Sequence, residues 1–173
     1  MSSAPGTTNS GRDVGVGVGV GGDDSDVDTS GLTVLGQTVR HPIDHLEWFD
    51  APAHVTGVRF SMDELQSLCP VTQQPDLSSL VIEYRPDRRC IESKSLKLYL
   101  WSFRERRVFC EALAAEIAGE VVRAVDPHEV RVTVTQHPRG GITTTAIAER
   151  RKDGTAGEGL DAHEGPDDHE GDR

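Results

Sequence analysis

The chain has 173 residues, 27% of them charged, and its formal net charge is -11 at pH 7. This length suits a single folded domain, and the acidic balance leaves no basic surface for nucleic acid. No run reaches the roughly 18 apolar residues of a membrane span, no secretory pattern opens the chain, and an odd count of three cysteines favours free thiols in the cytoplasm.

Two acidic, glycine-rich segments flank the central part of the chain. Residues 1–30 and 151–173 contain almost no large apolar side chains, so they cannot bury enough surface to offset the entropy of ordering. We predict that both are disordered and that residues 31–150 form the one folded domain. The run 17–22 fits a dinucleotide-binding glycine pattern, but no helix is predicted after it, which favours a linker.

The first half of the domain is predicted to contain two strands and a short helix between them. Residues 55–60 have the composition of a strand. Ser61, followed by Glu64, fits a capping box and predicts a helix that ends near Leu68. Residues 80–84 are β-branched and aromatic, which is typical of a second strand.

The second half is predicted to contain two helices and a hairpin. Apolar residues recur at helical spacing over 93–103 and again over 108–125. Alternating valines indicate a strand over 130–135, a Pro-Arg-Gly-Gly turn follows at 138–141, and residues 142–148 return as its partner. This order predicts an α+β fold, one sheet with two helices on one face, whose open edges favour a homo-oligomer.

Two side chains in the turn-rich stretch 67–76 are candidates for catalysis. Cys69 is either a small buried apolar residue or a nucleophile, and a reactive thiolate needs nearby cations, which Lys94 and Lys97 could supply. Asp76 is either a turn carboxylate or a proton donor. A donor role requires burial that raises its pKa by about three units above that of a free aspartate.

Further charged residues cluster near the predicted helix starts. Glu92 and Glu111 either stabilise the helix N-termini or accept hydrogen bonds from a ligand with adjacent N–H groups. Lys94, Lys97 and Arg139 are either solvated surface charges or a phosphate site. We predict no metal site, because no second cysteine or histidine stands at ligand spacing from Cys69.

Four motifs in this order resemble one enzyme family. Ser-Leu-Cys-Pro-Val-Thr-x-Gln-Pro-Asp over 67–76, Glu-Ser-Lys-Ser-Leu-Lys-Leu-Tyr over 92–99, Phe-x-Glu over 109–111 and Pro-Arg-Gly-Gly over 138–141 are similar to motifs of the NADPH-dependent nitrile reductases of the queuosine pathway. This is the 7-cyano-7-deazaguanine reductase family, and the resemblance covers 54–143 and its short single-domain type.

The resemblance implies a fold, an assembly and a reaction. The fold is the tunnelling fold (T-fold), whose units assemble into barrels with sites between subunits, as decamers of two pentamers. Cys69 attacks the nitrile carbon to give a thioimide, Asp76 donates the proton, and two NADPH molecules complete reduction to 7-aminomethyl-7-deazaguanine, a precursor of a modified tRNA base. The implied substrate contacts are Ile91, Glu92, Ser93, Cys110 and Glu111, and the implied NADPH contacts are Lys94, Ser95, Lys97 and Arg139.

One position departs from the family pattern, which usually has histidine where this chain has Cys110. A cysteine is a poorer hydrogen-bond donor, so the rate, pH profile and cofactor affinity could differ. We also hypothesise that Cys110 lies close enough to Cys69 for a protective disulfide. Two alternative functions are kept, a GTP cyclohydrolase-like hydrolase and a non-catalytic purine- or pterin-binding T-fold protein.

Overall fold

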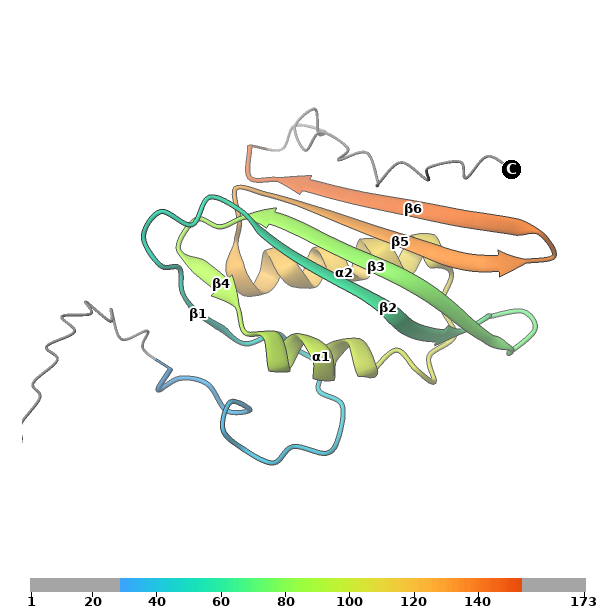
Figure 1. Cartoon of the computed structure of the whole chain (residues 1–173), viewed down its shortest axis with the longest axis horizontal. Helices are drawn as coiled ribbons and strands as arrows, with labels where there is room; N and C mark the ends of the chain where they lie inside the picture. Colours follow the sequence, from blue (N-terminus) through green and yellow to red (C-terminus); the bar gives the residue numbers. More distant parts are fainter. Residues whose placement is uncertain (1–28, 154–173) are drawn as a thin grey trace, which may run out of the picture.

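The computed structural model describes residues 29–153, so most of both predicted disordered tails lies outside the described residues. Its main sheet has four antiparallel strands in the order β2-β3-β5-β6 (Figure 1). These strands are β2 (Val58–Leu68), β3 (Pro75–Arg85), β5 (Glu129–Arg139) and β6 (Ile142–Arg151). The predicted hairpin is confirmed, and its Gly140 and Gly141 both have positive φ, which glycine adopts without strain.

Two helices cover one face of this sheet (Figure 1), as the sequence predicted. Helix α2 (Cys110–Val125) packs against β5 and β6, and the shorter α1 (Ser93–Trp101) lies beside β2. Ile117 and Val121 of α2 are fully buried in one core cluster with the inward-facing valines of β5. The α+β class with two helices on one face is therefore confirmed.

The opposite face of the sheet is polar and carries a ladder of alternating charges. Arg59 pairs in register with Glu83, Glu83 with Arg131, and Arg131 with Glu149, one residue from each strand. The Arg59–Glu83 contact is 2.5 Å and the Arg131–Glu149 contact is 2.9 Å. Opposite charges on neighbouring strands stabilise the pairing and fix its register.

The helix predicted to begin at Ser61 is wrong, because β2 continues as a strand to Leu68. The register shifts between Met62 and Leu65, where β2 advances three residues while β3 advances two. Such a bulge places apolar residues three apart on the same face of a strand. The same spacing occurs in a helical turn, which explains the wrong prediction. Ser61 and Glu64, which suggested a capping box, are exposed strand residues.

A second, two-stranded sheet was not predicted. It pairs β1 (Trp48–Asp50) with β4 (Arg89–Ile91), and the Arg89 guanidinium lies 3.8 Å from the centre of the Trp48 ring. Strand β4 leads directly into α1. This small sheet therefore fixes the position at which α1 begins.

Candidate functional site

Cys69 stands at the first position of a tight turn between β2 and β3. Its N–H donates to the carbonyl of Gln74 at 2.9 Å, and its carbonyl accepts from the N–H of Gln73 at 2.9 Å. Gln73 has a φ of 60°, a left-handed conformation that is uncommon for a residue with a side chain. Just before the turn, Leu68 exchanges backbone hydrogen bonds with Arg106 and Val108, which ties the turn to the segment that leads into α2.

The surroundings of the Cys69 sulfur favour the thiolate. The N–H of Thr72 points at Sγ from 3.5 Å, and the thiol is partly exposed. Hydrogen bonds from the side chain of Thr72 and from the N–H groups of Thr72 and Val71, with a further contribution from Arg139, lower the pKa of Cys69 to about 6. The cations expected from the sequence were Lys94 and Lys97, whereas the structure supplies Arg139.

Asp76 lies on the helix-covered face of β3, in the same alternation as Leu80 and Ile82, and only 4% of its surface is exposed. Its Oδ1 contacts Nη1 of Arg139, and no other described group donates a hydrogen bond to that oxygen. The expected burial is therefore present. A neighbouring guanidinium, however, stabilises the ionised carboxylate rather than the proton-donating acid.

The start of α2 lies at the same end of the sheet. Cys110 is buried, and its thiol points at the Val134 carbonyl at 3.6 Å. Burial, followed by the charge of Glu111, raises the pKa of this thiol. Glu111 itself is exposed in the first turn of the helix, where a ligand could reach its carboxylate.

The start of α1 is built around Glu92, the N-cap residue. Its two carboxylate oxygens accept from the N–H groups of Lys94 at 2.8 Å and Ser95 at 2.7 Å. Ser95 is fully buried and donates to the Glu92 carbonyl at 2.7 Å, so it orients this cap from inside. Ile91 is also buried, whereas Ser93 is exposed. The capping interpretation of Glu92 is confirmed.

The two lysines of α1 have different surroundings. The Lys94 ammonium donates to the carbonyl of Val34 at 2.6 Å and also to that of Gln37, which leaves one of its three N–H groups. Lys97 is exposed and borders an apolar groove between α1 and β2. Lys97 is thus the more accessible of the two cations.

Within one chain, the predicted site residues form two separate groups. Cys69, Asp76 and Arg139 lie with the start of α2 at the end of the sheet where β3 begins, whereas α1 lies alongside the sheet (Figure 1), where Ser93 and Lys97 border a groove with Leu80 and Ile82 in the middle of β3. At about 3.3 Å per strand residue, Leu80 and Ile82 lie on the order of 13–20 Å along β3 from Asp76. A single chain therefore does not bring all of the predicted residues to one pocket.

The chain resembles known reductases over its folded part. It is 50% identical over 93 residues to the NADPH-dependent 7-cyano-7-deazaguanine reductase of Alkalilimnicola ehrlichii, which covers 54% of this chain and 72% of that relative. The chain belongs to the 7-cyano-7-deazaguanine reductase family. The protein of the same name from Nitrosomonas europaea is 44% identical over 115 residues, covering 65% of this chain and 83% of that one.

Two further comparisons agree with membership of the reductase family. A family profile described as "QueF-like protein" matches residues 75–155. The solved structure of an archaeosine synthase QueF-Like in the apo form is 29% identical, with a TM-score of 0.52, and the match covers 54% of this chain and 92% of that one. The predicted T-fold class is thereby confirmed for this chain.

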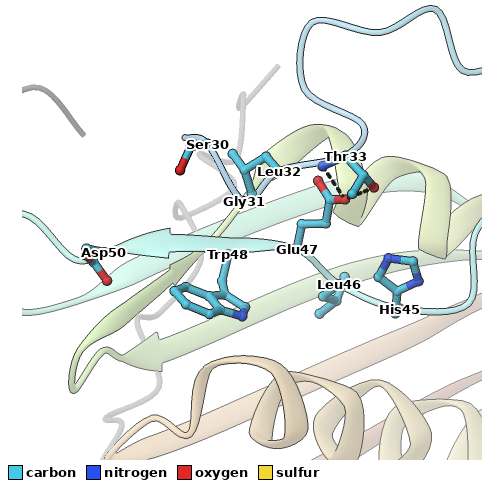
Figure 2. A pocket seen from close by; sticks show the side chains of 9 residues that line it. All are labelled: Ser30, Gly31, Leu32, Thr33, His45, Leu46, Glu47, Trp48 and Asp50. Carbon is cyan, nitrogen blue, oxygen red and sulfur yellow. Dashed lines mark hydrogen bonds between the residues drawn. The ribbon is translucent and has the colours of Figure 1, made fainter. Parts of the chain in front are cut away.

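One cavity of this family member, of about 430 Å³, lies beside the start of α1, because Glu47 in its wall bonds through its backbone to Ser95 and Glu92 (Figure 2). Glu47 borders it, and the Glu47 carboxylate accepts hydrogen bonds from the N–H and hydroxyl of Thr33 and from the N–H of Val34. This carboxylate is already satisfied, so its role is to fasten the segment that precedes β1. Sequence reasoning missed it, although a lone glutamate between Leu46 and Trp48 was a signal for a buried polar contact.

Among residues 29–153, neither helix is long and apolar enough to cross a membrane. Over the same residues, no group of three or more histidine, cysteine, aspartate or glutamate side chains is arranged to hold a metal ion.

Proposed function

We propose that this chain reduces the nitrile of 7-cyano-7-deazaguanine to a primary amine with NADPH, in the pathway that makes queuosine for tRNA. The observation that carries the proposal is the turn that holds an activated thiol at Cys69 and a buried carboxylate at Asp76. A nitrile accepts hydride poorly until a nucleophile has added to its carbon. These two residues provide the nucleophile and the proton that such an addition needs.

The addition step uses only groups on the Cys69 turn. The sulfur bonds to the nitrile carbon, the triple bond becomes a C=N double bond, and the nitrogen takes a proton from Asp76. The product of this step is a covalent thioimide. When bound, NADPH supplies hydride, once to the thioimide and once to the imine that follows it.

The proton that Asp76 delivers is best explained as one that it shares with Cys69. Arg139 beside Asp76 favours the ionised carboxylate, and the lowered pKa of Cys69 favours the thiolate. If both groups were ionised, neither could protonate the nitrile nitrogen. We propose that the pair holds one proton before substrate binds. Cys69 becomes the thiolate as Asp76 becomes the acid, which then protonates the nitrile nitrogen.

The exposed carboxylate of Glu111 is suited to grip the guanine-like edge, which presents adjacent N–H groups. Cys110 lies beside Glu111 at the start of α2 and lines the same end of the sheet. Ile91, Glu92 and Ser93 complete the purine site in this proposal. Because they lie apart from the Cys69 turn within one chain, they come from a neighbouring copy of the chain.

The cations at α1 fit a cofactor that carries phosphates. Lys97 is exposed, and Lys94 retains one N–H beyond those bound to the Val34 and Gln37 carbonyls. Ammonium groups bind phosphate as point charges. We propose that Lys97 and Lys94 hold NADPH, while buried Ser95 contributes by fixing the helix start.

The complete site then requires an oligomer, which we propose to be a decamer. Apolar side chains around the Cys69 end are exposed in the single chain: Val71 by 75%, Phe109 by 58% and Ile142 by 71%. Exposed apolar side chains gathered at one end of the fold support an interface there. A mixture of inactive Cys69→Ala and Lys97→Glu subunits should regain activity, because some sites combine a native Cys69 with a native Lys97. A mixture that stays inactive would contradict a shared site.

We assign the reaction to residues 31–150 and to the cytoplasm, where thiols stay reduced. The test follows NADPH absorbance with and without 7-cyano-7-deazaguanine. Consumption that depends on the nitrile supports the proposal, and consumption that is equal in both samples contradicts it.

A further inference from the structure

Arg139 ends β5 and turns back over the Cys69 turn. We infer that Arg139 is a positioning residue, which holds Cys69 and Asp76 in place and balances their shared charge before any ligand binds. This inference rests on the proposed function and deepens it. It gives Arg139 a role at the nucleophile in addition to the expected contact with NADPH.

The reach of Arg139 depends on an irregularity in β5. Val134 faces the helices, and in a regular strand a residue five positions later would face the opposite side. The pairing of β5 with β6 shifts register between Gln136 and Arg139, which re-aims the following side chain. Arg139 consequently meets Asp76, which lies on the helix-covered face.

One guanidinium contacts two residues of the turn and Asp76 at the start of β3. Its Nη2 donates to Gln74 Oε1 at 2.8 Å and approaches Thr72 Oγ1 at 3.5 Å, and its Nη1 contacts Asp76 Oδ1. Thr72 in turn directs its N–H at the Cys69 sulfur. The planar fork of arginine can hold several acceptors in fixed directions, whereas lysine cannot.

The turn has few other attachments. Residues 71–75 are all exposed, so apolar packing does not hold them. The second side chain that holds the turn is Arg107, which donates to Gln73 Oε1 at 2.8 Å but contacts neither Cys69 nor Asp76 in any hydrogen bond or ion pair of the described residues. Arg107 is therefore a matched control for the loss of one arginine from this turn.

Charge balance gives Arg139 its effect on reactivity. A thiolate and a carboxylate on one turn disfavour each other, so the pair with one proton carries a single negative charge. Arg139 compensates that charge next to Asp76, where a buried carboxylate without a partner would be unfavourable. Charged or titratable groups near this end also include Arg107, Glu111 of α2, Arg106, which is paired with Glu116, Arg104, which donates to Gln66, and His137, which lies 3.4 Å from the Ser79 hydroxyl.

The test measures the pH dependence of Cys69 alkylation by iodoacetamide, without nitrile or NADPH, in the full chain. Mass spectrometry of the peptide that contains Cys69 separates it from the buried Cys90 and Cys110. We expect Arg139→Gln to move the midpoint upward, on the order of one pH unit. We expect Arg139→Lys to give an intermediate midpoint and Arg107→Gln to leave the native one.

The inference would be overturned if the pH profile of Cys69 alkylation in Arg139→Gln superimposed on the native profile while the KM for NADPH was raised. Arg139 would then have only a role in binding the cofactor. If Arg139→Gln does not fold, Arg139→Lys decides, and superposition of its profile overturns the inference. Because alkylation needs no substrate, this result is independent of whether the chain reduces nitriles.

Discussion

Glu92 and Asp76 are buried carboxylates in different parts of the same fold, exposed by 5% and 4%, yet their partners differ in kind. Glu92 accepts hydrogen bonds from two backbone N–H groups of the helix it caps. Asp76 has a side-chain cation, Arg139, as its partner. Backbone groups of a helix start are fixed, whereas a side chain can be displaced by a ligand.

The difference separates a carboxylate that backbone groups hold in place from one that a side chain holds. Around Glu92, the serine, the backbone and the second carboxylate at Glu47 are satisfied within the fold. Around Asp76, the neighbouring thiol is partly exposed and the turn contains a left-handed residue at Gln73. Strain and partial exposure of this kind are concentrated at functional sites.

The largest effect that tests this comparison is expected for Cys69→Ala. Without the sulfur no thioimide can form, so nitrile-dependent NADPH consumption should disappear. Cys90→Ala is the matched control, because Cys90 is buried within strand β4 of the two-stranded sheet and its loss should leave turnover in place. Nitrile-dependent turnover in Cys69→Ala would show that the reduction is not covalent.

Asp76→Asn should be nearly as severe for turnover while sparing purine binding. The amide keeps the size of the side chain but cannot pass a proton, and loss of such a group slows a reaction by about 10²–10⁴-fold. Steady-state rates and a titration with the deazapurine measure the two properties separately. The exposed Asp63→Asn serves as control, and equal slowing in both variants would remove Asp76 from the mechanism.

Glu47→Ala should destabilise the segment before β1, which Glu47 holds in place, without removing a group that takes part in the reaction. It removes a carboxylate that accepts from Thr33 and Val34, and the loss should cost about 2–3 kcal/mol of the free energy of unfolding. Glu116→Ala, which breaks the exposed Arg106 pair, should cost under about 1 kcal/mol. Denaturant unfolding compares the two, and equal losses would contradict the structural assignment.

The Glu47 contribution should also depend on pH. Burial favours a higher pKa, but the hydrogen bonds from Thr33 and Val34 outweigh it and hold the pKa of Glu47 below its ordinary value of 4.5. A lowered pKa in the folded state stabilises the protein above that ordinary value, and the stabilisation fades as the pH falls through the lowered one. The gap between native and Glu47→Ala stability should therefore narrow in acid.

The smallest expected effect concerns the hypothesised disulfide between Cys69 and Cys110. Burial raises the pKa of Cys110, so its thiol should react slowly and the linkage should accumulate only under sustained peroxide treatment. Mass spectrometry should then find the two peptides joined. In Cys110→Ala, Cys69 should instead progress to sulfinic acid, and no linkage in the native protein would rule out this protection.

The sequence predicted the helices over 93–103 and 108–125 and the turn at Cys69 well, because helical periodicity and bounding prolines are local signals. The prediction failed in β2, where the bulge between Met62 and Leu65 places apolar residues three apart, as in a helix. The sequence also did not predict that Glu47 binds Val34 or that Arg139 contacts Asp76, because each contact joins segments that are far apart in the chain. Long-range register, rather than composition, determines those positions.

The most direct test is the mass of the intact protein after incubation with 7-cyano-7-deazaguanine in the absence of NADPH. We predict a gain equal to one substrate molecule, located by peptide mapping at Cys69 and lost in Cys69→Ala. No gain, or a gain at Cys90 or Cys110 instead, would contradict covalent attack by Cys69.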